Sequence, residues 1–274
     1  MREEDIADKS YKQMYEAGDE MKLAVLGCYG GIGGTRRTTS LLLDEDVLID
    51  AGTGAGELSL ERMAKVDHVF LTHSHLDHCG FIPLLADAVA FLRNQPLLVH
   101  ALPQTIAALK ENMLNGKLWP DYSALPTVDE PYIRFVPIKP GETTLLGHRR
   151  ITPLPARHAV PAVGYCIDSG EGSFVYSGDT TDYKPFWVAL NSIGNLLYLM
   201  IETTFLNTNA EGAARSGHMT AALLVQGLAR LQRPVTLLIT HLEPGKEDSI
   251  MAEVTAACAA YQPVRLEQGR EFEF

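Results

Sequence analysis

The stretch Thr72-His73-Ser74-His75-Leu76-Asp77-His78 determines the interpretation of this chain. The apolar residues 68–71 before it predict a buried strand, and the apolar residues from 81 onward predict a helix. Four side chains of metal-binding type therefore follow the carboxyl end of a strand, where open α/β sheets place their ligands. His73 and His75 are two positions apart and lean to the same side of an extended segment, so they can bind one ion. Asp77 and His78 lie past the bend and can bind a second ion.

Three further side chains of this type stand next to apolar runs in the second half of the chain. His158 comes just before a predicted strand, whereas Asp179 and His241 each come directly after one. Two ions held by three ligands each, with a shared bridge, account for all seven side chains: His73, His75 and His158 for one ion, Asp77, His78 and His241 for the other, and Asp179 as the bridge. Imidazole and carboxylate ligands suit zinc, iron or manganese.

Composition and charge restrict the class of protein. The 274 residues are 46% hydrophobic and 21% charged, which is typical of a globular enzyme. The net charge of −11 argues against a nucleic-acid partner, because binding a phosphate backbone needs clustered Lys and Arg. Metal ions could still attract a small phosphate ester locally. The four cysteines form no CxxC pair and are expected to be reduced, buried thiols.

Targeting and membrane signals are missing from the sequence. No apolar run reaches the ~18 residues that span a bilayer, and the N-terminus lacks the apolar centre of a signal peptide. We therefore expect a cytoplasmic protein with no membrane partner.

Strand and helix patterns follow one another along the chain without a low-complexity linker. The two strand-rich halves, each with outer helices, predict an α+β fold, an αββα sandwich of two mixed β-sheets flanked by helices. Residues 21–274 are interpreted as one domain, and the polar residues 1–20 as an N-terminal extension. Strands are expected at residues 23–28, 41–43, 47–50, 133–136, 151–154, 163–168, 174–177, 196–201 and 235–240, and helices at 56–63, 81–92, 103–115, 183–191, 218–231 and 247–261.

Three irregular segments carry weaker signals. The glycine-rich residues 27–37, which include Arg36 and Arg37, do not have the spacing of a phosphate-binding loop. Residues 50–54 predict the turn that ends a strand beneath the site, without chemistry of its own. Residues 116–143 predict a long, lid-like loop with one short strand, in which Trp119 and Tyr122 could stack on a base, although packing is the commoner role of such residues.

The histidine stretch, His158, Ser177-Gly178-Asp179 and Thr240-His241 together resemble the metallo-β-lactamase superfamily. More narrowly, residues 23–246 resemble the class II cyclic-nucleotide phosphodiesterases, relatives of ribonuclease Z, most specifically at Asn115 and Trp119-Pro120-Asp121. The resemblance implies an αββα fold of the metallo-β-lactamase type, two divalent metal ions, a homodimer, and hydrolysis of 3′,5′-cyclic AMP or GMP to the 5′-nucleotide. The chain departs from the family where it lacks a Ser-Pro after His78 and carries Glu243 in place of a basic residue.

The resemblance also implies a proton-transfer pair. In these relatives a glutamate and a histidine in the contexts of Glu202 and His218 serve proton transfer, so these two residues are expected to be catalytic. The metal ligand Asp77 is the third expected catalytic residue. A hydroxide that bridges the metals would attack phosphorus, while a protonated His218 oriented by Glu202 donates to the leaving 3′ oxygen. His68, His100 and His148 lack such a context and are expected to be structural.

Other functions fit parts of the pattern. An RNA phosphodiesterase like ribonuclease Z predicts a basic insertion that grips tRNA, and the sequence contains none. A hydrolase of another ester or thioester would use the same metal ligands. A metal-binding protein without turnover would have no use for Glu202 and His218. We therefore expect a small phosphodiester substrate, no nucleic-acid partner, and two ions for which zinc is favoured over manganese or iron.

Overall fold

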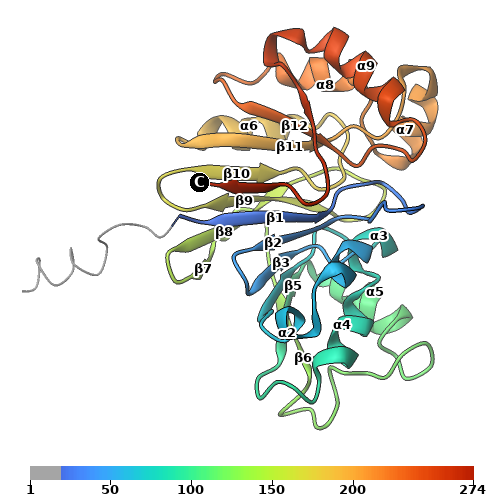
Figure 1. Cartoon of the computed structure of the whole chain (residues 1–274), viewed down its shortest axis with the longest axis vertical. Helices are drawn as coiled ribbons and strands as arrows, with labels where there is room; N and C mark the ends of the chain where they lie inside the picture. Colours follow the sequence, from blue (N-terminus) through green and yellow to red (C-terminus); the bar gives the residue numbers. More distant parts are fainter. Residues whose placement is uncertain (1–19) are drawn as a thin grey trace, which may run out of the picture.

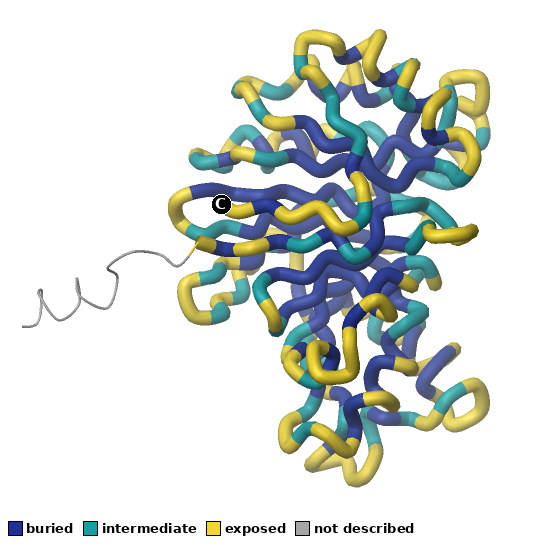
Figure 2. Tube along the Cα trace, viewed as in Figure 1, coloured by how far each residue is buried: buried dark blue, intermediate teal, exposed yellow. Residues whose placement is uncertain are grey.

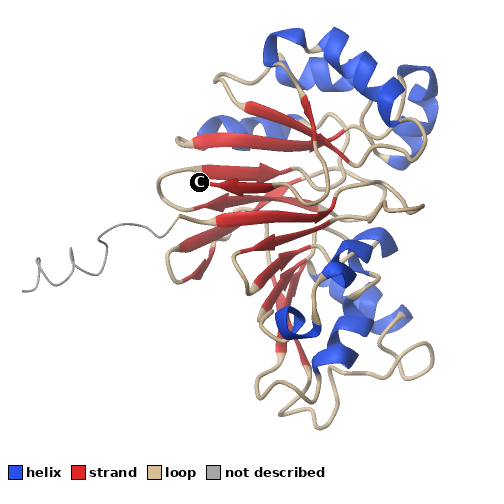
Figure 3. Ribbon diagram, in the orientation of Figure 1, coloured by secondary structure: helices blue, strands red, loops and turns tan. Residues whose placement is uncertain are grey.

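Two seven-stranded β-sheets pack face to face, and helices cover the outer face of each (Figures 1 and 3). This computed structural model describes residues 20–274, so the proposed extension at residues 1–20 lies almost wholly outside the described residues. The first sheet contains, in spatial order, β14 (Glu271–Glu273), β1 (Lys22–Gly27), β2 (Ser40–Leu43), β3 (Val47–Ile49), β4 (His68–Phe70), β5 (Leu97–Ala101) and β6 (Ile133–Pro137). The second contains β13 (Val264–Arg265), β12 (Thr236–Thr240), β11 (Leu196–Glu202), β10 (Ser173–Tyr176), β9 (Val163–Asp168), β8 (Arg149–Pro155) and β7 (Thr144–Leu146). The predicted sandwich is confirmed.

Both sheets mix parallel and antiparallel pairs, as predicted. In the first sheet, β3 to β6 pair in parallel, and in the second, β10 to β13 do. Parallel neighbours need long crossover connections, which here carry most of the helices. The first half carries η1 (Thr53–Glu57), α2 (Leu60–Met63), α3 (Leu76–Cys79), α4 (Ile82–Val89) and α5 (Pro103–Asn112). The second half carries α6 (Lys184–Ser192), η2 (Asn207–Asn209), α7 (Ala210–Ser216), α8 (Ala221–Leu228), α9 (Glu247–Ala257) and η3 (Ala259–Tyr261).

The apolar core lies in three layers, and the buried residues of Figure 2 follow them. One layer lies between the two sheets and includes Phe70, Tyr165 and Phe174. The other two layers lie between each sheet and its outer helices. Trp119 and Tyr122 pack in the helical layer of the first sheet, and the Tyr122 hydroxyl donates to Asp87. Their role is therefore packing rather than base stacking. Every helix within residues 20–274 is too short or too polar to cross a membrane.

Several element boundaries differ from the sequence predictions. The helix predicted at residues 56–63 is two short helices, η1 and α2. The helix predicted from His218 begins at Ala221, because Thr220 caps it by accepting a hydrogen bond from the Leu223 amide at 3.4 Å. His218 therefore lies in the connection after α7, whose C-terminus is capped by Gly217 with φ +75°. β14 was missed because this strand has only three residues, two of which are charged. Only its pairing with β1 makes it a strand.

A pair formed by the half-buried His68 and the buried His100 predicts a pH-dependent stability. His68 Nδ1 and His100 Nε2 lie 2.9 Å apart, and the His100 ring stacks on Phe70. Burial, with a smaller effect of His68, lowers the pKa of His100 from 6.5 to about 4. Between these values the unfolded chain binds the proton and the folded chain does not, so we expect the free energy of unfolding to fall as the pH drops from 6.5 to 4. The full loss is about 3 kcal/mol.

Urea unfolding of the metal-free protein at intervals between pH 4 and 7 measures this effect. His100→Gln should flatten the pH dependence relative to the wild type, whereas His148→Gln, at an exposed position, should leave it unchanged. Equal pH slopes for the wild type and His100→Gln would contradict the assignment.

Candidate active site

The seven side chains predicted to bind metal converge at one edge of the sandwich. They come from the segments that follow β4, β8, β10 and β12, with Asp77 and His78 in α3, and the two packed sheets bring these segments together. Potential ligand atoms of His73, His75, His158 and Asp179 all lie within 4.8 Å of one another, and so do those of Asp77, His78, Asp179 and His241. The two clusters divide the side chains as the sequence analysis did, and Asp179 belongs to both.

Asp179 presents one carboxylate oxygen to each cluster. Its Oδ2 lies 3.7 Å from Nε2 of both His73 and His158. Its Oδ1 lies 3.4 Å from Nε2 of His78 and 3.5 Å from Nε2 of His241. The preceding Gly178 has φ +58°, and a Cβ there would lie 2.5 Å from the Val163 carbonyl oxygen. Only glycine therefore allows this turn, which aims Asp179 between the two clusters.

The hydrogen bonding at these atoms fits bound cations. His73 Nε2 and Asp179 Oδ1 are buried and have no hydrogen-bond partner among residues 20–274. His78 Nε2 and His241 Nε2 face each other at 3.2 Å, and His158 Nε2 and His75 Nδ1 do so at 3.1 Å. Two imidazole lone pairs that face each other at this distance need a proton or a cation between them. The donor set of imidazoles and carboxylates is one that divalent metals bind.

Burial sets the charge state of the first cluster. It lowers the pKa of His73 well below the usual value, and it also lowers the pKa of His75 and His158. Burial alone would raise the pKa of Asp179, but His241 and His78 lower it well below the usual range. Neutral imidazoles beside an ionised carboxylate are the protonation states that bind a metal.

Asp50 supports His78, a role that the sequence analysis missed. The Asp50 carboxylate is buried and accepts hydrogen bonds from His78 Nδ1 at 2.7 Å and from the Thr72 amide at 2.8 Å. A carboxylate that accepts from one ring nitrogen orients the other toward a metal. The turn at residues 50–54 therefore lies beneath the site, and it supports the site through His78 without binding a metal itself. The signal was present, because Asp50 directly follows an apolar strand, as Asp179 nearly does.

We expect Asp50→Ala to weaken metal binding by ~10–100-fold, because His78 loses the acceptor that fixes its ring. Competition of the protein against a zinc chelator measures this affinity. Asp129→Ala, at an exposed loop position, is the matched control and should bind zinc like the wild type. Equal affinities for Asp50→Ala and the control would contradict the supporting role.

Glu202 and His218 form a hydrogen-bonded pair beside the clusters. His218 Nδ1 lies 2.8 Å from Glu202 Oε1, and Glu202, the last residue of β11, is fully buried. Burial lowers the pKa of His218, but the negative charge of Glu202, its hydrogen bond to the ring and the charge of Asp179 together outweigh burial and raise that pKa to about 9. Nε2 of His218 makes no hydrogen bond to the described part of the chain and remains available to a substrate.

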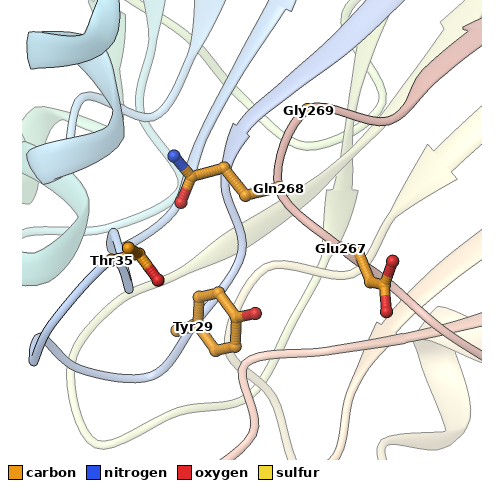
Figure 4. Close-up of a pocket in the computed structure, with 5 residues that line it drawn as sticks. All are labelled: Tyr29, Thr35, Glu267, Gln268 and Gly269. Carbon is orange, nitrogen blue, oxygen red and sulfur yellow. The ribbon is translucent and has the colours of Figure 1, made fainter.

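The glycine-rich segment lies against the second cluster. The Gly30 backbone is so close that a Cβ there would lie 2.9 Å from His241 Nδ1. Arg36 and Arg37 form ion pairs with Glu247 and Glu57, so neither is free for an anionic substrate. An open pocket of about 390 Å³ adjoins this segment and is lined by Tyr29, Thr35 and residues 267–269 (Figure 4). It contains none of the residues of the two clusters.

The four cysteines take no part in either cluster. All are free and buried, as predicted, and the Cys79 thiol donates to the Ser74 carbonyl.

Comparison with known proteins identifies the family. A beta-lactamase superfamily domain model matches residues 45–242. The chain belongs to the metallo-β-lactamase superfamily. The relation to ribonuclease Z that the sequence predicted is also confirmed.

Curated relatives of this superfamily protein include ribonuclease Z of Methanopyrus kandleri, which is 29% identical over 157 residues, 55% of this chain and 51% of the relative. The chain thus spans about half the length of this relative and of ribonuclease Z from Parabacteroides distasonis. The probable metallo-hydrolase YhfI of Bacillus subtilis is 26% identical over 246 residues, 85% of this chain and 92% of YhfI.

Solved structures share the fold of this superfamily protein. The crystal structure of YhfI from Bacillus subtilis has a TM-score of 0.73 at 22% identity and covers 93% of this chain and 100% of its own. Unliganded yeast PDE1 has a TM-score of 0.79 at 15% identity and covers 92% of this chain and 99% of its own.

Proposed function

We propose that this chain is a dinuclear-metal phosphodiesterase and that its substrate is a 3′,5′-cyclic nucleotide, which it hydrolyses to the 5′-nucleotide. The observation that carries the proposal is the position of Asp179, with one carboxylate oxygen in each of two adjacent histidine clusters. The Glu202–His218 pair adds a proton donor beside them. The structural likeness to yeast PDE1 supports the same reaction class.

Each side chain then has a defined task. His73, His75 and His158 would hold one divalent ion, Asp77, His78 and His241 the other, and Asp179 both. When bound, such ions lower the pKa of a water molecule and neutralise charge on a phosphoryl oxygen. Zinc fits the donor set best, with manganese or iron as alternatives.

Glu202 and His218, beside the clusters, carry out proton transfer. Glu202 accepts from His218 Nδ1 and so leaves Nε2, with its proton, without a hydrogen-bond partner in the described part of the chain. From this nitrogen His218 protonates the departing 3′ oxygen, which would otherwise leave as a basic alkoxide. Asp50 and the Gly217 carbonyl accept from His78 and His158, and thereby keep the opposite nitrogens of these rings directed at the clusters.

An RNA phosphodiester is the second candidate substrate, favoured by sequence identity to ribonuclease Z. Charge opposes it. The chain carries a net charge of −11, and many of its cations, including Arg36, Arg37 and Arg149, are paired with acidic residues. A tRNA backbone needs clustered, unpaired cations.

A hydrolysis screen of the zinc-, manganese- and iron-loaded protein tests the proposal. The substrates are cyclic AMP, cyclic GMP, bis(p-nitrophenyl) phosphate, a pre-tRNA and an acyl thioester, and chromatography identifies the products. We expect 5′-AMP or 5′-GMP, and no 3′-nucleotide. Cleavage of the pre-tRNA with intact cyclic nucleotides would establish the RNA candidate instead, and cleavage of the thioester alone would exclude both.

A further inference from the structure

The hydroxyl of Thr204 lies between the metal clusters and the proton-transfer pair. Thr204 follows β11 by two residues and is 5% exposed. Its Oγ1 lies 2.9 Å from Glu202 Oε2, 3.0 Å from His241 Nδ1 and 3.2 Å from His218 Nδ1. One hydroxyl thus contacts a side chain of the second cluster and both members of the pair.

The direction of these hydrogen bonds follows from the number of protons available. A hydroxyl donates one hydrogen bond and accepts two, whereas an ionised carboxylate only accepts. Glu202 already accepts from the backbone amides of Thr180, Thr204 and Met219 and from His218 Nδ1. This concentration of donors marks an ionised carboxylate, so the Thr204 hydroxyl donates to Glu202 Oε2. A lone pair of Oγ1 is then left for the nearest ring nitrogen that has no other acceptor.

That nitrogen is Nδ1 of His241. His218 Nδ1 donates to Glu202 at 2.8 Å, so its longer contact with Thr204 is secondary. His241 is 3% exposed, and the Gly30 backbone lies against the same edge of its ring. Thr204 Oγ1 is the hydrogen-bond acceptor that the described chain offers to this nitrogen. His241 Nδ1 therefore carries the proton, and the lone pair is on Nε2.

The consequence concerns the second cluster. His241 Nε2 lies 3.1 Å from Asp77 Oδ2 and 3.2 Å from His78 Nε2. A hydrogen bond that fixes which ring nitrogen is protonated, and how the ring is turned, orients a metal-binding histidine. The Asp50 carboxylate orients His78 in this way by a direct hydrogen bond. The Glu202 carboxylate orients His241 indirectly, because the Thr204 hydroxyl lies between them.

We propose that Thr204 is a positioning residue that holds His241 for the second metal ion, and that it joins this ion's site to the Glu202–His218 pair through a single carboxylate. The proposal rests on the proposed metal-dependent function. It assigns Glu202 two tasks, orienting His218 and, through Thr204, orienting His241.

Zinc binding and histidine NMR test the proposal without an activity assay. Thr204→Val keeps the side-chain shape and removes the hydroxyl, and Thr204→Ser restores it. Thr203→Val is the matched control, because Thr203 is buried next to Thr204 but its hydroxyl donates to the Glu202 carbonyl. His241→Ala marks the zinc affinity and the ring resonances that belong to the second site. Circular dichroism of each variant verifies the fold.

We expect two zinc ions in the wild type, and in Thr204→Val a ~10–100-fold weaker affinity of the site that His241→Ala affects. The other site should keep its affinity, and Thr204→Ser and Thr203→Val should bind like the wild type. In long-range ¹H–¹⁵N spectra of the zinc-loaded protein, His241 should show a protonated Nδ1 in the wild type and lose this single form in Thr204→Val.

The outcomes distinguish a failure of the role of Thr204 from a failure of the metal-dependent function. Two zinc ions in the wild type, with an unchanged second-site affinity and unchanged His241 resonances in Thr204→Val, would overturn the role of Thr204 alone. Equal loss in Thr204→Val and Thr204→Ser would also overturn it, since the hydroxyl would then not be the cause. A wild-type protein that binds no zinc, manganese or iron would overturn the metal-dependent function and this role together.

Discussion

Asp179→Ala is expected to lose both metal binding and hydrolysis. Its two carboxylate oxygens serve different clusters, so alanine removes a ligand from each at once, together with the negative charge that offsets two cations. We expect hydrolysis of the best substrate to fall by ~10³-fold or more, the scale of losing a group that stabilises charge in a transition state. Elemental analysis after dialysis should find less than one metal ion per chain.

A matched control separates this effect from a general loss of acidic charge. Asp248 is exposed and pairs only with Arg265 in the described structure, so Asp248→Ala should keep both metal content and activity. Because Asp179 is buried, circular dichroism of Asp179→Ala must show a folded protein. A folded Asp179→Ala protein that retains two ions and full activity would remove the bridge from the proposed site.

His218→Ala is expected to keep both metal ions and to lower turnover by ~10²–10⁴-fold. The His218 ring belongs to neither cluster of potential ligands. Its Nδ1 lies 2.8 Å from Glu202 Oε1, and its Nε2 makes no hydrogen bond to the described part of the chain. Loss of a proton donor matters most when the leaving group is strongly basic. The variant should therefore lose far more activity on a cyclic nucleotide, which expels an alkoxide, than on bis(p-nitrophenyl) phosphate, which expels a weakly basic phenolate.

The two substrates decide what His218 does. Equal losses on both would show that His218 does not protonate the leaving group, and wild-type rates on the cyclic nucleotide would remove it from the mechanism. On these two substrates Glu202→Gln should show the same loss of turnover as His218→Ala, because an amide does not stabilise the positive charge of the imidazole. Through Thr204 it should also weaken the second metal site. His148→Ala, at an exposed position, is the control and should behave like the wild type.

Local pattern predicted most of the architecture. The apolar runs of five strands are long enough, or rich enough in residues that favour strands, to be recognised in the sequence: β1, β4, β9, β11 and β12. Their alternation with helices implied two layered sheets. Two kinds of element were missed or misplaced. β14 is a strand only because the distant β1 pairs with it, whereas α8 starts late because of a local signal, the cap at Thr220, that was not recognised.

The chemical identity of the candidate site was determined by the sequence alone. His73, His75, Asp77 and His78 crowd into six positions, and His158, Asp179 and His241 each stand beside an apolar strand, so the donor types and their division into two groups could be inferred. What the tertiary structure decided is which atoms face which. The contacts of Asp50 with His78 and of Thr204 with His241 join residues that are 28 and 37 positions apart in the sequence. Hydrogen bonds act over about 3 Å, so only the packed sheets could specify them.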